Sequence, residues 1–228
     1  RMLGPDFGYV QAAPPGTYNS LDSFGNLECT PPFTHRTRGD VYLFGRIVYG
    51  APSPGTTRDG IQQSVRDLLH AQAVQDPIPL DSGWLSVGHV DSLSVRDSAA
   101  MFSVLPMKDA PLGFRVLVAS PYLAFAILRG LARRGLGSAT IRWAESWVTD
   151  KPVDEILANP HFEPLNDFVE SKVREAITTL ITEVGLDRSD FIPLPVIFNG
   201  YLRGTHDNVV EMDPAKPFSF YQNQLRPP

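Results

Sequence analysis

The sequence contains very little cysteine: Cys29 is the single thiol among 228 residues. One cysteine cannot form an intramolecular disulfide, and it cannot supply a cysteine-rich zinc or iron–sulfur site. This count is compatible with a reducing compartment. We therefore expect the cytoplasm, with the nucleus as the alternative.

Long apolar runs and basic clusters are also missing. No stretch approaches the ~18 consecutive apolar residues of a membrane helix, and residues 1–6 lack the apolar core of a signal peptide. Lysine and arginine total 20 against 25 aspartates and glutamates, and the densest basic cluster is the pair Arg133 and Arg134. Phosphate binding needs a concentrated basic face, so we expect neither a membrane nor a nucleic acid as the main partner.

The composition otherwise matches that of a globular protein. Apolar residues make up 43% of the chain, which excludes a disordered one. The 21 prolines are nearly twice the usual share of roughly 5%, so many tight connections are expected. The length suits one large domain or a part of a larger one.

The hydrophobic pattern predicts a mixed α/β chain without a regular βαβ alternation. The predicted strands are residues 6–10, 41–49, 84–90, 101–106, 114–119, 140–143 and 192–198. The predicted helices are residues 57–74, 121–134, 152–158 and 165–184. Ser120 and Pro121 are suited to the N-cap and first position of the second helix, and Gly135 and Gly185 to helix ends. After residue 199 the pattern fades into a polar tail.

Residues 84–91 contain two side chains that could carry out chemistry together, His89 and Asp91. In a strand, Val87, His89 and Asp91 share one face, with His89 and Asp91 about 7 Å apart. An imidazole that donates a proton near neutral pH, beside a carboxylate that accepts two hydrogen bonds from a guanidinium, suits an arginine side chain. A motif this short more often has a structural role, and the neighbouring residues must decide between a structural and a functional role. Trp84 is expected to pack.

Residues 21–28 form a second candidate segment. Gly25 and Asn26 predict a turn that precedes Glu28. Such a turn can offer backbone carbonyls and a carboxylate together, and these oxygen ligands are the ones that calcium prefers. The same residue types also mark an ordinary turn, so both interpretations remain open at this point.

Five segments carry a resemblance to one family. Residues 4–10, 21–28 and 84–91, in this order and at these intervals, resemble the C-terminal catalytic domain of the protein-arginine deiminases. Residues 45–47 and 113–121 match the same family. Three long motifs in register are far more specific than any one of them.

The resemblance extends from residue 1 to about residue 195, and residues 196–228 form a divergent tail. It implies a pentein-type fold, an α/β propeller built of ββαβ modules. Residues 1–228 would then be a partial catalytic domain, so the propeller is expected to be incomplete in this chain.

The resemblance also implies an activity. The family hydrolyses a carbon–nitrogen bond of peptidyl-arginine to give peptidyl-citrulline and ammonia, and it requires calcium. By motif, His89 resembles the general acid and base, Asp91 one of two carboxylates that hold the guanidinium, and Val87 a residue lining the same pocket. The implied partners are arginine-containing proteins, and a homodimer is compatible with the resemblance.

The implied calcium ligands all offer oxygen donors. Phe24 and Leu27 resemble ligands that act through their backbone carbonyls, and Glu28 resembles a side-chain ligand of the same ion. Asp6 matches a further calcium-binding aspartate. Calcium, Ca2+, is therefore the expected cofactor.

Two parts of the family pattern have no counterpart in these residues: the second guanidinium-binding carboxylate and the nucleophilic cysteine. Cys29 follows Glu28 directly, where the family does not place its nucleophile, and we expect it to be a small packed residue. The isolated chain is therefore expected to be inactive, whether the segment bearing the nucleophile is truncated or deleted. The alternative is a non-enzymatic relative that binds calcium or arginine peptides.

Overall fold

The structure of the protein is a computed structural model. It describes residues 20–22, 24–51, 61–71, 75–85, 89–90, 101–141, 151–198, 202–204 and 210–212. The predicted strand at residues 6–10 lies outside these ranges. No helix in the described ranges is long and apolar enough to cross a membrane.

The first sheet has three strands in the order β1 (Leu27–Cys29), β4 (Ile47–Ala51) and β5 (Ile78–Asp81). Strand β1 pairs with β4 antiparallel, and β5 pairs with β4 parallel. Helix α1 (Gln63–Ala71) lies between β4 and β5 along the chain, as a parallel pair requires a crossover. The helix predicted at 57–74 is confirmed at residues 63–71, whereas the described residues 61 and 62 precede it.

The second sheet repeats this pairing with β6 (Phe102–Pro106), β7 (Phe114–Ser120) and β10 (Phe191–Pro195). Strand β6 pairs with β7 antiparallel, and β10 pairs with β7 parallel after a helical connection. Both sheets thus follow a ββαβ order with the second strand in the middle. The predicted α/β class is confirmed, while the closure of such units into a propeller stays a prediction.

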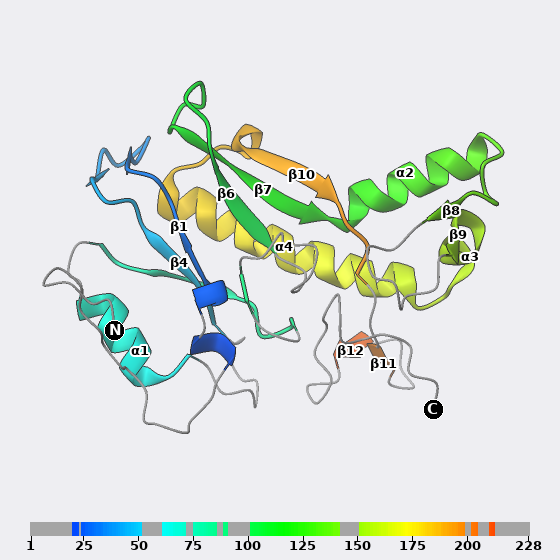
Figure 1. The fold of residues 1–228 in the computed structure, drawn as a ribbon, viewed down its shortest axis with the longest axis horizontal. Helices are drawn as coiled ribbons and strands as arrows, with labels where there is room; N and C mark the ends of the chain where they lie inside the picture. The colour runs from blue at the N-terminus through cyan, green and yellow to red at the C-terminus, as the bar shows by residue number, and fades with distance from the viewer. Residues whose placement is uncertain are drawn as a thin grey trace, which may run out of the picture.

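Helix α4 (Phe162–Val184) joins the two sheets. Figure 1 shows it running along the second sheet, with its carboxyl end at the first. Its buried residues recur at a spacing of three or four and form one core with both sheets. The core residues of α4 are Leu165, Val169, Val173, Ala176, Leu180 and Val184. The strands contribute Val48, Ile78, Leu80, Phe102, Phe114, Val116 and Val118.

The remaining elements are short, apart from α2, and surround this core. They are η1 (Ser20–Asp22), η2 (Phe24–Asn26), β2 (Phe33–Thr34), β3 (Val41–Tyr42), α2 (Pro121–Arg133), β8 (Thr140–Ile141), β9 (Lys151–Pro152), α3 (Val153–Ala158), η3 (Arg188–Asp190), β11 (Leu202–Gly204) and β12 (Val210–Met212). The pair β11 and β12 lies in the segment that we predicted to be a polar tail, so that prediction is wrong in part.

The predicted helix caps are confirmed. The Ser120 hydroxyl accepts a hydrogen bond from the Leu123 amide at 3.2 Å, and Pro121 is the first residue of α2. Gly135 and Gly185, with φ of 78° and 80°, follow α2 and α4 in the left-handed conformation that ends helices.

Two predicted strands differ from the structure in the residues that it describes. Residues 41–49 are not one strand, because Gly45 at φ 72° turns the chain between β3 and β4. Leu43 and Phe44 in that turn are 70% and 73% exposed. Trp84 lies in a turn rather than a strand, and the actual strand is β5, which the pattern did not predict.

The charge pattern on α4 gives a pH-dependent prediction at Asp167. Partial burial raises the pKa of this carboxyl above its ordinary value, and Glu163 and Glu170 raise it further against the opposing Arg129. The folded state therefore holds the proton more tightly than the unfolded chain. Stability should fall as pH rises from the ordinary aspartate pKa of about 3.9 through the raised value, and then stay constant.

Replacing Asp167 with asparagine should consequently raise the midpoint of thermal unfolding at pH 7. The side chain is exposed, so the gain should be within about 0.5 kcal/mol. Circular dichroism at pH 7 and pH 3 measures it, because the two proteins should differ at pH 7 and converge at pH 3. An unchanged or lower midpoint for the variant at pH 7 would contradict the sign.

Candidate functional site

The turn at residues 24–28 is fixed by a buried side chain, Asn26. Its amide nitrogen donates to the carbonyls of Leu21 at 2.8 Å and Gly50 at 2.9 Å. Its amide oxygen accepts from the Gly50 amide at 2.9 Å, so Asn26 is hydrogen bonded to β4 in both directions. The backbone of the predicted calcium-binding turn is therefore held rigidly on the first sheet.

Asp22 ties the same segment to α1. Its Oδ1 atom accepts a hydrogen bond from the Gln62 amide at 2.8 Å, immediately before the helix begins. Its Oδ2 atom is buried and has no hydrogen-bond partner among the residues that the structure describes. An unpaired buried carboxylate oxygen is costly unless a cation balances it. The surroundings of this turn are thus suited to a cation, and sequence reasoning did not single out Asp22.

Glu28 connects the two sheets. It lies on β1, and its Oε1 atom accepts a hydrogen bond from the Val104 amide of β6 at 2.7 Å. Within the described residues, no group of three or more His, Cys, Asp or Glu side chains is arranged to hold a metal. A metal site at Glu28 would therefore depend on backbone carbonyls, such as those of Phe24 and Leu27, which are hard oxygen donors suited to calcium.

His89 lies directly against this turn. A Cβ atom built on Gly25 would come within 2.7 Å of His89 Nδ1, 3.1 Å of Cε1 and 3.6 Å of Cγ. The imidazole and the turn are far apart in sequence, yet they touch in the fold. The structure therefore brings the predicted acid–base residue to the predicted metal-binding segment.

The chain between β5 and His89 is anchored by Asp81 and Trp84. The Asp81 carbonyl accepts a hydrogen bond from Trp84 Nε1 at 3.0 Å, and its carboxylate accepts one from the Gly83 amide at 3.1 Å. The Trp84 ring is fully buried and lies 6.4 Å from the Phe168 ring and 5.9 Å from the Phe198 ring. Trp84 is thus the packing residue that the sequence predicted.

Lys172 of α4 forms an ion pair with Asp81 at the end of β5. Its ammonium lies 3.1 Å from the Asp81 carboxylate and 3.0 Å from Glu175. Burial lowers the pKa of Lys172, but its hydrogen bonds to Glu175 and Asp81 raise it more, so the net shift is upward. The ammonium therefore stays charged and keeps β5 attached to α4.

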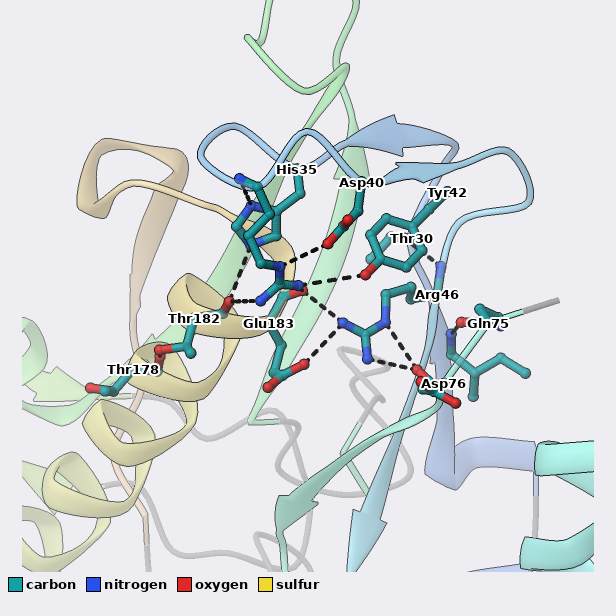
Figure 2. Close-up of polar contacts among 12 residues, drawn as sticks. Thr30, His35, Asp40, Tyr42, Arg46, Gln75, Asp76, Thr178, Thr182 and Glu183 are labelled. Carbon is teal, nitrogen blue, oxygen red and sulfur yellow. Dashed lines mark hydrogen bonds and ion pairs between the residues drawn. The ribbon is translucent and has the colours of Figure 1, made fainter. Parts of the chain in front are cut away.

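Arg46 attaches the first sheet to the carboxyl end of α4, as Figure 2 shows. Its guanidinium donates to the Asp76 carbonyl at 2.7 and 2.9 Å and to the Glu183 carbonyl at 2.7 Å. The Glu183 carboxylate lies 3.1 Å away. The Arg46 amide donates to the Thr30 hydroxyl at 2.8 Å, just after β1. This cluster fixes the strand that carries Glu28.

His35 adds a second attachment to the same end of α4. Its Nδ1 atom accepts hydrogen bonds from the Thr37 and Arg38 amides at 3.3 and 3.2 Å. These donors assign the proton to Nε2, which donates to the Thr182 carbonyl at 3.1 Å. Sequence reasoning missed both His35 and Arg46, because their partners lie far along the chain.

Replacing Arg46 with methionine should destabilise the protein by about 2–4 kcal/mol. The Arg46 side chain is only 5% exposed, and its loss leaves the Asp76 and Glu183 oxygens without their donor. Urea unfolding measures the change. Arg38→Met is the matched control, because Arg38 donates to the same end of α4 but is 40% exposed, and it should cost clearly less stability than Arg46→Met. Equal losses in the two variants would contradict the role of Arg46.

The structure thus brings together four of the seven predicted site residues. Phe24, Leu27 and Glu28 lie in the turn and strand that contact His89 through Gly25. The other three, Asp6, Val87 and Asp91, lie outside the described residues. The expectation that Cys29 is packed is wrong, because β1 is an edge strand and the Cys29 side chain is exposed.

A sequence model described as protein-arginine deiminase matches residues 1–221. Human protein-arginine deiminase type-3 is 38% identical over 202 residues, which are 87% of this chain and 29% of that protein. Human protein-arginine deiminase type-4 is 38% identical over 200 residues, which are 87% of this chain and 28% of that protein. Rat protein-arginine deiminase type-3 is 37% identical over 209 residues, which are 89% of this chain and 30% of that protein. The chain spans about three-tenths of the length of these relatives.

Proposed function

The chain belongs to the protein-arginine deiminase family, and on this premise we propose that it takes part in the calcium-dependent hydrolysis of peptidyl-arginine to peptidyl-citrulline and ammonia. The observation that carries the proposal is the contact of His89 with the turn that contains Phe24, Leu27 and Glu28. An acid–base group and a set of oxygen donors meet there, as this reaction requires. The substrates would be arginine side chains of proteins.

The residues at the turn fit a calcium ion by their donor chemistry. Glu28 would hold the ion through its carboxylate, Phe24 and Leu27 would hold it through their carbonyls, and Asp6 would serve a further ion. The buried Oδ2 of Asp22, which has no hydrogen-bond partner within the described part of the chain, supports a cation in this neighbourhood. When bound, calcium would supply positive charge to balance these oxygens beside His89.

The chemical role that we propose for His89 is to move protons. A guanidinium is a poor electrophile, so a thiolate must attack its carbon, and the carbon–nitrogen bond breaks as ammonia leaves. His89 would donate a proton to the departing nitrogen and then take one from the water that releases citrulline. Asp91 would accept hydrogen bonds from the guanidinium, and Val87 would line the same pocket.

The thiolate in this scheme is not assigned to Cys29, which neighbours the metal-binding Glu28. We propose that the isolated 228 residues do not catalyse the reaction, because it requires a nucleophile and a pair of carboxylates. The alternative function is a calcium- or arginine-peptide-binding relative without catalysis. This alternative is kept because the single cysteine of these residues lies next to Glu28 and is not assigned as the nucleophile.

The assay that tests the proposal measures citrulline from an arginine-containing peptide. The full-length protein that contains these residues should form citrulline with calcium and none with a calcium chelator. Glu28→Gln should raise the calcium concentration needed, whereas Glu175→Gln, on the exposed face of α4, should not. A full-length protein that binds calcium but forms no citrulline would favour the non-enzymatic alternative. Calcium-stimulated citrulline formation by the isolated chain would overturn the proposal that it is inactive.

A further inference from the structure

We propose that Gly25 is a positioning residue for His89, because its missing side chain lets the imidazole rest on the backbone of the metal-binding turn. The inference rests on the proposed function, since it assigns a role within the same site. It names a residue to which the sequence motif gave no function beyond forming a turn.

The first argument is steric. The position that a Gly25 Cβ would occupy is 2.7 Å from His89 Nδ1, a separation that real Cβ atoms do not adopt. No backbone atom of another segment is among the three nearest contacts, so the glycine is required by the ring of His89. Gly25 does not have a positive φ, so the turn itself accepts an alanine.

The second argument is the difference in rigidity between the two partners. The turn is held by the three hydrogen bonds of Asn26, by Asp22 on α1 and by Glu28 on β6. His89 contacts the turn through its imidazole ring, which lies at the end of a side chain with two rotatable bonds. A methyl group at residue 25 would therefore displace the imidazole rather than the turn.

The third argument concerns the two ring nitrogens. The edge that faces Gly25 is formed by Nδ1 and Cε1, whereas Nε2 lies farther away than these atoms. The Nδ1–Cε1 edge of the ring therefore faces the turn, and the position of Gly25 defines how the ring is oriented. Because the contact is direct, the position of Gly25 sets where the imidazole lies relative to the proposed oxygen ligands of the same turn.

Long-range 1H–15N spectra of the imidazoles in the 228-residue chain test the contact without an activity assay. Gly25→Ala should shift the His89 signals, while the His35 signals, from a buried residue, stay in place and report an intact fold. Gly130→Ala is the matched control, because nothing lies within 4 Å of its added Cβ on α2. His89 signals that coincide in wild type and Gly25→Ala would overturn the proposal.

If Gly25→Ala does not fold, the double variant with His89→Ala decides the question. Removing the imidazole removes the clash, so the double variant should regain the fold, and failure to regain it overturns the proposal. In the full-length protein, Gly25→Ala should lower kcat by about 10–100-fold while KM and the calcium requirement change less than about threefold. A full-length wild type that forms no citrulline would contradict the proposed function, whereas the spectra would still decide the positioning role.

Discussion

Replacing His89 with alanine is expected to reduce citrulline formation by the full-length protein by about 10²–10⁴-fold. The imidazole lies against the turn at Gly25 and is the proposed acid–base group, so its loss would remove the proton donor for ammonia and the base for water. Calcium binding should persist, because the proposed ligands are the oxygens of Phe24, Leu27 and Glu28. Colorimetric citrulline detection and calorimetric calcium titration measure the two effects.

The control for this variant is His70→Ala, which removes an exposed imidazole from the last turn of α1. It should leave citrulline formation unchanged. His89→Ala activity within threefold of the wild type would contradict the acid–base role. A parallel loss of calcium binding would instead indicate that His89 supports the structure of the turn.

Replacing Gly45 with alanine should lower the free energy of unfolding by about 4 kcal/mol or more, a large share of the total of about 5–15 kcal/mol. The added Cβ would lie 1.8 Å from the Thr30 carbonyl oxygen, and φ is 72°. Thr30 cannot retreat, because its amide donates to the Arg46 carbonyl and its hydroxyl accepts from the Arg46 amide. Expression followed by urea unfolding measures the loss.

Gly39→Ala separates the two causes of that loss. Gly39 has φ 76° but nothing within 4 Å of its Cβ position, so only the conformational cost of about 1–2 kcal/mol applies. The difference between the variants reports the clash with Thr30. Equal stability of Gly39→Ala and Gly45→Ala would contradict the close contact between the turn and the segment after β1.

The helices were predictable where local chemistry defines their ends. Ser120 and Pro121 begin α2 because a hydroxyl can accept a hydrogen bond from a helix amide and proline fits the first turn. Gly135 and Gly185 end α2 and α4 because glycine adopts a positive φ at low cost. These signals depend on neighbouring residues alone, so the sequence was sufficient.

The strands were less predictable, because the backbone turns at residues whose side chains are typical of strands. The apolar residues between β3 and β4 look like part of a strand, yet Leu43 and Phe44 are exposed because Gly45 turns the chain beside Thr30. Trp84 has a side chain typical of strands, but its indole packs in a turn against α4. Contacts distant in sequence decided both cases.

The motif resemblance proposed members of the site, but it did not predict their contacts. The motif resemblance named Glu28 and His89, but not the hydrogen bond of Glu28 to Val104 or the packing of His89 on Gly25. Both contacts depend on how the segments meet in the fold. Asn26 is a similar case, because its residue type predicted a turn while its function is to bind the Gly50 backbone of β4.

The most direct test of the account is a crystal structure of this chain grown with calcium. We predict an ion coordinated by the Glu28 carboxylate and the carbonyl oxygens of Phe24 and Leu27, at about 2.3–2.6 Å. The His89 imidazole should lie on Gly25 beside it. A calcium-soaked crystal with no ion at these oxygens, or with His89 away from the turn, would contradict the account.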